Sequence, residues 1–368
     1  MTLFHCEGYE TLGTTSTTGA DLEARINKTP SCNFQEVNGG HTDDIALIAG
    51  QGGVGLAMRM PLGLNTRGTF LRMEWPSAYK VSTNASHPVM VTGFRYYNAV
   101  SDPAVNRTIW NHMTGATSLG ASLSTASNGT DLVWVDVTGT VTISDVITAD
   151  TWHFIEIEFK PSAGGAGSVE IHVDGSSVYT GTSRNLTSFT FLSSYGVRLG
   201  LQTSANETGG NRTAFDDVYQ LTVDGVVHTG PLGDVKVRLL TPTSDDAPNT
   251  WSRSAGADNF ALIDEQDWVT SDYVEADATG EDDHYGLTTL TGAATVHGLQ
   301  VDVVCQAIDG TPTLHIVFDN GTASEVSGGV IGTATTEVVR NFFATDPSAV
   351  AWTQTSVNSV EATQRMTE

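Results

Sequence analysis

The sequence has few basic residues. Its 17 lysines and arginines stand against 42 aspartates and glutamates, which gives a formal net charge of −25. A surface with this excess of negative charge repels phosphate groups, so nucleic-acid binding is disfavoured, and so is an anionic membrane surface. The sequence also lacks an apolar run of about 18 residues, which a spanning helix needs. We therefore expect a protein that binds no nucleic acid and inserts into no membrane.

Cysteine is scarce as well. Cys6, Cys32 and Cys305 are too few for a disulfide scaffold, and no Cys-x-x-Cys pair indicates a zinc site. Cys6 and Cys32 fall in segments that we predict to be neighbouring N-terminal strands, so a bridge between them stays open beside the alternative of three reduced thiols. The N-terminus has neither a basic region nor an apolar stretch, so we expect no secretory signal peptide there.

What the sequence does contain is typical of a β-protein. Threonine and valine suit pleated, half-buried strands, and the 38 glycines are spread through the chain as tight turns require. Thr69–Trp75 alternates between apolar and polar residues and stops at Pro76. Trp152–Lys160 and Ser168–Asp174 follow the same pattern, and Asp174-Gly175 is a hairpin turn signal. These segments predict antiparallel strands with one face toward water.

A chain of 368 residues exceeds what one hydrophobic core usually serves, so we expect two domains. A Gly/Pro-containing stretch near residues 228–233 marks the boundary between residues 1–228 and residues 233–368. The second part opens with Asp234–Leu240, whose alternation predicts a strand. Near the C-terminus, an Asp-Pro-Ser helix start predicts a short helix over Ala349–Ala362.

Three segments of the first part resemble the concanavalin-A-like lectin/glucanase (laminin-G-like) sandwich: Trp152–Lys160, Ser168–Gly175 and Phe215–Gly225. The opening Glu7–Glu10 is similar to the start of that domain. The resemblance implies an all-β fold. Its first domain would be an antiparallel jelly-roll β-sandwich, followed by a second, smaller β-rich sandwich domain with one short C-terminal helix.

A narrower resemblance covers most of the chain. Gly233–Val237, Asn259–Glu265 and the Asp346…Trp352…Asn358 pattern follow the sandwich in the same order as in structural proteins of tailed-phage virions. This implies a virion component made in the host cytoplasm, such as a decoration, fibre or tail-tip protein. It would dock on other virion proteins as a homo-oligomer, for which we predict a trimer, and would contact the host surface.

Enzyme motifs are missing from the sequence. Glycoside hydrolases with this sandwich carry a Glu-x-Asp-x-x-Glu strand that places two carboxylates together, and the nearest segments here, Glu156–Glu158 and Glu170–Asp174, lack that triple. No Gly-x-Ser-x-Gly motif marks a nucleophile either. We therefore predict a non-enzymatic protein. The alternatives are a carbohydrate-binding adhesin and, less favoured, a glycoside hydrolase of the same fold.

Two sets of residues are candidates for ligand contacts. Trp110, Trp134, Tyr96 and Tyr97 are aromatic residues that could stack on a host-surface glycan; the alternative is that they fill the core. Asp216 and Asp217 could bind calcium, because hard cations take carboxylate and carbonyl oxygens. The alternative is that one caps a loop and the other faces solvent.

Overall fold

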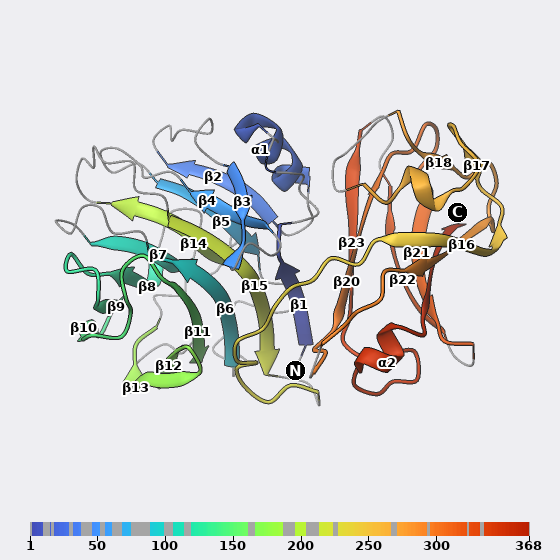
Figure 1. The fold of residues 1–368 in the computed structure, drawn as a ribbon. Coiled ribbons are helices and arrows are strands. Elements are labelled where there is room, and N and C mark those ends of the chain that lie inside the picture. The colour runs from blue at the N-terminus through green and yellow to red at the C-terminus, as the bar shows by residue number, and fades with distance from the viewer. Residues whose placement is uncertain are drawn as a thin grey trace. The chain divides into compact units, whose positions relative to one another are not determined.

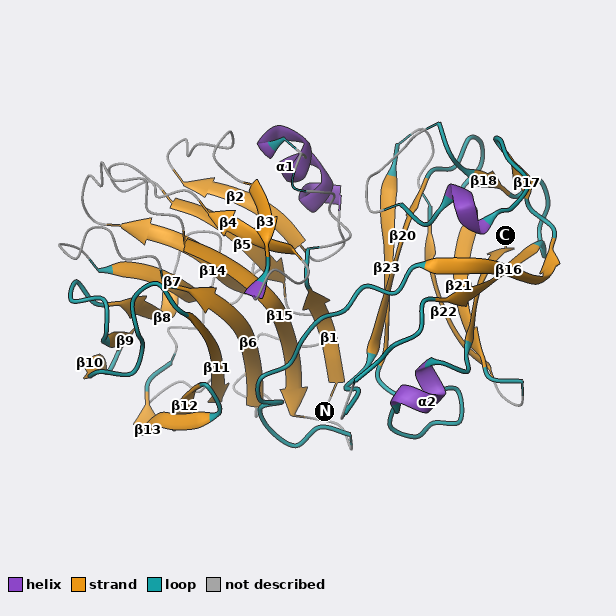
Figure 2. Ribbon diagram, in the orientation of Figure 1, coloured by secondary structure: helices purple, strands orange, loops and turns teal. Residues whose placement is uncertain are grey.

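The protein is described here from a computed structural model, drawn in Figure 1. The structure describes residues 2–9, 15, 18–28, 32–37, 46–51, 56–60, 68–74, 89–98, 106–113, 119–160, 166–186, 196–203, 213–223, 227–265, 271–292, 295–321, 324–331 and 335–367. Strands account for most of the regular structure in these ranges (Figure 2). The chain forms two compact units, the first mainly residues 1–237 and the second mainly residues 238–368.

The first unit is built from two antiparallel sheets. The eight-stranded sheet has the order β13 (Ser176–Arg184), β12 (Gly167–Val173), β11 (Trp152–Lys160), β6 (Val89–Tyr97), β15 (Thr213–Val223), β4 (Leu56–Met60) and β3 (Ala46–Ala49), with β1 (Thr2–Glu7) paired to β15. The seven-stranded sheet has the order β10 (Gly139–Ile143), β9 (Leu132–Asp136), β8 (Leu119–Thr125), β7 (Arg107–Met113), β14 (Gly196–Thr203), β5 (Gly68–Glu74) and β2 (Cys32–Val37). One helix, α1 (Gly19–Lys28), lies between β1 and β2 in sequence.

The core of the first unit lies between these two sheets. The Trp110 ring of β7 is 5.5 Å from the Phe159 ring of β11, so these side chains point toward the opposite sheet. Neighbouring residues along a strand point to opposite faces. This fixes an inner face for each sheet, toward the other sheet, and an outer face turned away from it.

Residues 228–237, here called the cover segment, leave β15 and pack on the outer face of the eight-stranded sheet. The N–H of Leu232 donates to the Tyr219 hydroxyl, and the N–H of Val237 donates to Asp217. The prediction of a strand over Asp234–Leu240 was wrong: none of these residues pairs in a sheet. The polar groups of this stretch bond instead to side chains of β6 and β15: Asp234 and Val235 accept from Arg95, and the Val237 N–H donates to Asp217.

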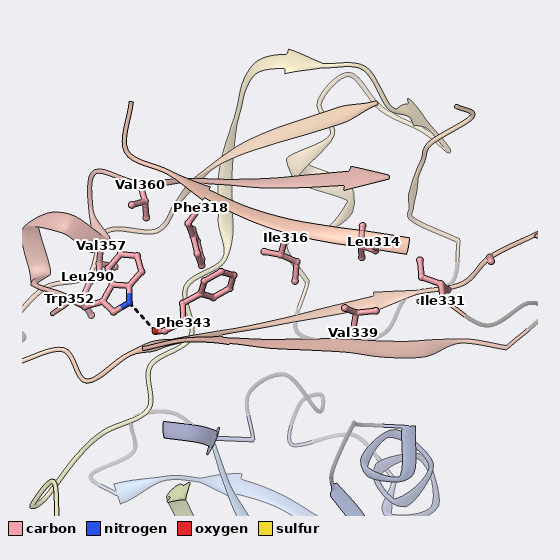
Figure 3. Packing of buried hydrophobic residues seen from close by; sticks show 11 residues of the cluster. Leu290, Leu314, Ile316, Phe318, Ile331, Val339, Phe343, Trp352, Val357 and Val360 are labelled. Atoms are coloured by element: carbon pink, nitrogen blue, oxygen red, sulfur yellow. Dashed lines mark hydrogen bonds between the residues drawn. The ribbon is translucent and has the colours of Figure 1, made fainter. Parts of the chain in front are cut away.

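The second unit is also β-rich. Its five-stranded sheet has the order β16 (Pro242–Asn249), β19 (Asp282–Leu287), β24 (Glu361–Thr367), β21 (Thr313–Asp319) and β22 (Ser324–Val330), and two-stranded sheets pair β17 (Ser252–Arg253) with β18 (Val274–Glu275) and β20 (Leu299–Cys305) with β23 (Glu337–Phe343). Figure 3 shows Ile316 and Phe318 of β21 facing Phe343 of β23 across the core. The Trp352 indole N–H donates to the Phe343 carbonyl at 2.9 Å. The all-β sandwich prediction is confirmed.

The predicted C-terminal helix is much shorter than expected. Only α2 (Gln354–Val357) is helical, and β24 begins at Glu361. Thr353 caps α2 by accepting from the Ser356 N–H. Asp346 accepts from the N–H groups of Ser348 and Val350, so the Asp-Pro-Ser stretch forms a turn rather than a helix start.

Cys6 and Cys32 were predicted to lie in neighbouring strands, and this was wrong. Cys6 lies in β1, which pairs with β15 of the eight-stranded sheet, whereas Cys32 lies in β2, which pairs with β5 of the seven-stranded sheet. Within the described ranges, no helix has the length and apolar character needed to cross a membrane.

Candidate functional site

The aromatic residues singled out in the sequence lie mostly in the core. Trp110, Trp134 and Tyr96 are each 0% exposed. The Trp110 and Trp134 rings stack at 5.7 Å, and Tyr96 is 5.5 Å from Phe215. In this structure these three rings offer no face to a sugar, because protein covers both sides. Tyr97 is partly exposed at the end of β6, with its ring 5.3 Å from that of Trp152.

The two aspartates proposed for calcium make bonds within the protein. Asp217 accepts from the Arg95 Nε–H at 2.8 Å and from the Val237 N–H at 2.8 Å. Asp216 accepts from the N–H of Asp217, also at 2.8 Å. Over the part of the chain that the structure describes, no group of three or more histidines, cysteines, aspartates and glutamates lies together as a metal site would need.

The outer face of the eight-stranded sheet holds a buried ion pair under the cover segment. Arg95 is 1% exposed and bonds to both Asp217 and Asp234, and it also donates to the Val235 carbonyl at 3.3 Å. Its guanidinium carbon lies 5.3 Å above the Phe154 ring. The charges on this face are therefore neutralised from within the protein, as burial requires.

A buried tyrosine and glutamate complete the same face. The Tyr219 hydroxyl donates to Glu156 at 2.5 Å, and the Gly233 N–H donates to the same carboxylate at 2.8 Å. Burial, together with the Glu156 charge, raises the pKa of Tyr219 well above its ordinary value. The Tyr219 ring crosses β6 at Gly93, where an added Cβ would lie 2.0 Å from the ring. Glu156 is thus a structural partner of the cover segment.

The outer face of the seven-stranded sheet is different in character. Residues directly opposite each other on antiparallel strands project from the same face. The register therefore places six side chains in one line across six consecutive strands, from β10 to β5. We call this line the polar row, and its members are Thr140, Val135, Ser122, Asn111, Arg198 and Arg72. Trp110 and Leu199 face inward, so their chain neighbours Asn111 and Arg198 face outward.

Asn111 lies in the middle of the polar row. It is 0% exposed, and neither its amide nitrogen nor its amide oxygen has a hydrogen-bond partner. A buried polar group without a partner is destabilising by about 1–3 kcal/mol, and such groups are rare.

Two arginines lie beside Asn111. Arg198 pairs with Asn111 on one side and with Arg72 on the other, so two guanidinium side chains are cross-strand neighbours. Arg198 is 5% exposed, and burial together with the Arg72 charge lowers its pKa to about 10. Like charges directly opposite each other destabilise a sheet.

Sequence reasoning missed the polar row. A signal was present, since Arg72 stands between Leu71 and Met73, and Arg198 between Val197 and Leu199. A lone arginine between two inward apolar residues marks the outer face of a strand. What the sequence does not give is the strand order that brings β5, β14 and β7 together.

No protein-family model and no curated protein matches the chain. Solved structures do. A marine PL-14 alginate lyase from Aplysia kurodai has 12% identity and a TM-score of 0.42, covering 60% of this chain and 100% of that chain. An endo-β-1,4-glucuronan lyase from the fungus Trichoderma reesei has 15% identity and a TM-score of 0.39, with coverages of 54% and 92%. A carbohydrate esterase from the Shiga toxin-encoding bacteriophage phi24B has 12% identity and a TM-score of 0.35, with coverages of 51% and 88%.

At these identities the likeness concerns the β-sandwich fold, which these carbohydrate-active proteins share, and it transfers no activity. The prediction of a non-enzymatic protein is nevertheless contradicted, because the matching structures are enzymes. The missing Glu-x-Asp-x-x-Glu strand does not separate this chain from enzymes on a similar frame. The prediction is not retained.

Proposed function

We propose that this protein is a saccharide-recognising component of a tailed-phage particle, with the polar row as its saccharide-binding surface. The observation that carries the saccharide part is Asn111, a fully buried amide with no partner, in line with two arginines and a serine on one sheet face. Saccharide sites use a few well-placed polar groups on a rigid frame. Strands hold these groups more rigidly than loops would.

The shape of the row suits a chain-like ligand. Its members lie on consecutive strands, which are spaced about 4.8 Å apart. The residues range from exposed Thr140 and Val135 at the β9–β10 side to buried Asn111 and Arg198 toward the middle. A ligand with hydroxyl groups along its length could bond at several points of this line.

The virion part of the proposal is supported by where the phage-like motifs lie. Asp234 bonds to Arg95 in the first unit. In the second unit, Asn259 donates to Asp283 at 2.5 Å and Trp352 donates to the Phe343 carbonyl. The motifs that resemble virion proteins are thus residues that hold each unit together. In this proposal the chain assembles with other virion subunits, as a trimer, and meets host-surface glycan.

Two experiments test the two parts. A glycan array with the full chain is expected to give binding that Asn111→Ala removes and that Asn27→Ala, a change at an exposed site on α1, leaves intact. Binding to no saccharide, or equal binding by Asn111→Ala, would contradict the saccharide proposal. Mass spectrometry of purified particles is expected to detect the chain, and its absence there would contradict the virion proposal.

A further inference from the structure

The cover segment is also the connection between the two units. We infer that it acts as a releasable strap: tension between the units peels residues 228–237 off the first unit, and the connection lengthens while both units stay folded. This inference goes beyond the proposed function and does not depend on it.

The first step of the argument is the way in which the cover segment is attached. Among the described residues, its hydrogen bonds to the eight-stranded sheet end on side chains. Arg95 donates to Asp234 and to the Val235 carbonyl. Three backbone N–H groups of the segment donate to the sheet: Leu232 to Tyr219 at 3.0 Å, Gly233 to Glu156 at 2.8 Å and Val237 to Asp217 at 2.8 Å. The backbone ladders that join β6 to β11 and to β15 lie beneath it, so it can leave without breaking a strand pair.

The second step is how little apolar surface the cover segment buries. No residue from 229 to 237 is fully buried, and Asp234 and Lys236 are exposed. Burial of apolar area is the dominant favourable term when elements pack together. A segment that is held mainly by hydrogen bonds, with few buried apolar contacts, belongs to the parts of a protein that open at low free energy.

The third step is how the chain continues. Val237 is the last residue of the first unit, and Leu240 already packs against the core of the second unit. A pull on the second unit therefore loads the bond of Val237 first, and the bonds nearer β15 only after it has broken. Bonds that are loaded one after another break singly, at a lower force than bonds that share the load.

Release would change the reach of the connection and leave both cores intact. The last strand of the first unit, β15, ends at Val223, before the cover segment begins, and the core of the second unit takes in Leu240, after it ends. The ten residues 228–237 extend to at most about 33–36 Å when fully stretched. The distance that the two units can separate would grow accordingly.

Native-state hydrogen exchange of the full chain at low urea concentrations tests whether the cover segment opens by itself. The amides of residues 229–237 are expected to exchange through an opening with a smaller urea dependence than that of β6, β11 and β15, because less surface becomes exposed. Asp234→Asn weakens the bond to Arg95 and should raise the open population about 3- to 10-fold. Asp258→Asn, at an exposed site in the second unit, is the matched control and should leave it unchanged.

Optical tweezers with handles at the two termini test the response to tension. The full chain is expected to lengthen reversibly, by at most about 36 Å, below the force that unfolds either unit. Asp234→Asn should lengthen at a lower force than the parent and Asp258→Asn. Lengthening only when a unit unfolds, an equal force in all three chains, or exchange of residues 229–237 only together with β6, β11 and β15 would overturn the inference.

Discussion

The outer faces of the two sheets in the first unit handle buried polar groups in opposite ways. Under the cover segment, Arg95 is neutralised by Asp217 and Asp234, and Glu156 accepts from Tyr219. On the polar row, the side-chain amide of Asn111 has no hydrogen-bond partner. The comparison teaches that burial alone does not mark a functional residue. What differs between the two faces is whether the buried side chain has a partner within the protein.

The largest effect is expected when the buried cation Arg95 is removed from the outer face of the eight-stranded sheet. Arg95→Met leaves Asp217 buried without its charged partner, so the free energy of unfolding should fall by about 3–5 kcal/mol. Urea denaturation measures this. The double variant Arg95→Met/Asp217→Asn should recover part of the loss, because it removes the stranded charge. A fall of less than about 1 kcal/mol in the single variant would show that the pair does not stabilise this face.

The hydroxyl under the cover segment should have the next largest effect. Tyr219→Phe removes a donor from buried Glu156 and an acceptor from the Leu232 N–H. Unfolding free energy should fall by about 1–3 kcal/mol. Tyr179→Phe, in β13 and only partly buried, is the matched control and should stay within about 0.5 kcal/mol of the parent. Equal changes in the two variants would argue against the hydrogen-bonded network.

A pair of fully buried asparagines contrasts the two kinds of site directly. The Asn98 side chain donates to the Gly129 carbonyl at 2.8 Å, whereas the Asn111 side-chain amide has no hydrogen-bond partner. Thermal and urea unfolding of Asn98→Leu should therefore show a loss of about 1–3 kcal/mol. Asn111→Leu should be neutral or stabilising by up to about 1 kcal/mol. A loss as large as that of Asn98→Leu would mean that Asn111 supports the fold.

The smallest expected effect is a pH dependence. Burial, then the Glu170 charge, raises the pKa of Glu158 above its ordinary value. The folded state therefore binds this proton more tightly than the unfolded state. Its contribution is fully present below about pH 4.5, the ordinary glutamate value, and is lost as the pH rises through the folded pKa. Glu158→Gln should be more stable than the parent at pH 7, and this gain should be absent at pH 4. A gain that does not change with pH would contradict this.

The sequence predicted local features well. Trp152–Lys160 and Ser168–Asp174 were predicted as strands, and the hairpin turn at Asp174-Gly175 is present, with positive φ at both residues. These features depend on alternation and turn chemistry, which short segments contain. Asp234–Leu240 has the same alternation and forms no strand, because its polar groups bond to side chains of β6 and β15 rather than to the backbone of another strand.

The candidate site could not be predicted from the sequence. The sandwich places Trp110 and Trp134 inward and Asn111 outward, and a large aromatic residue alone does not reveal its face. Arg72 and Arg198 lie far apart in the chain. They become neighbours only because β14 inserts between β5 and β7, and such pairings depend on the long-range strand order.

Hydrogen–deuterium exchange of the full chain, with and without the saccharide that binds most tightly on the glycan array, tests the contrast between the two faces most directly. The proposed function predicts added protection in β7 and in its neighbours β8 and β14, with β6, β11 and β15 unchanged. The same ligand should give no added protection in Asn111→Ala. Added protection confined to β6, β11 and β15, or protection that persists in Asn111→Ala, would contradict the account.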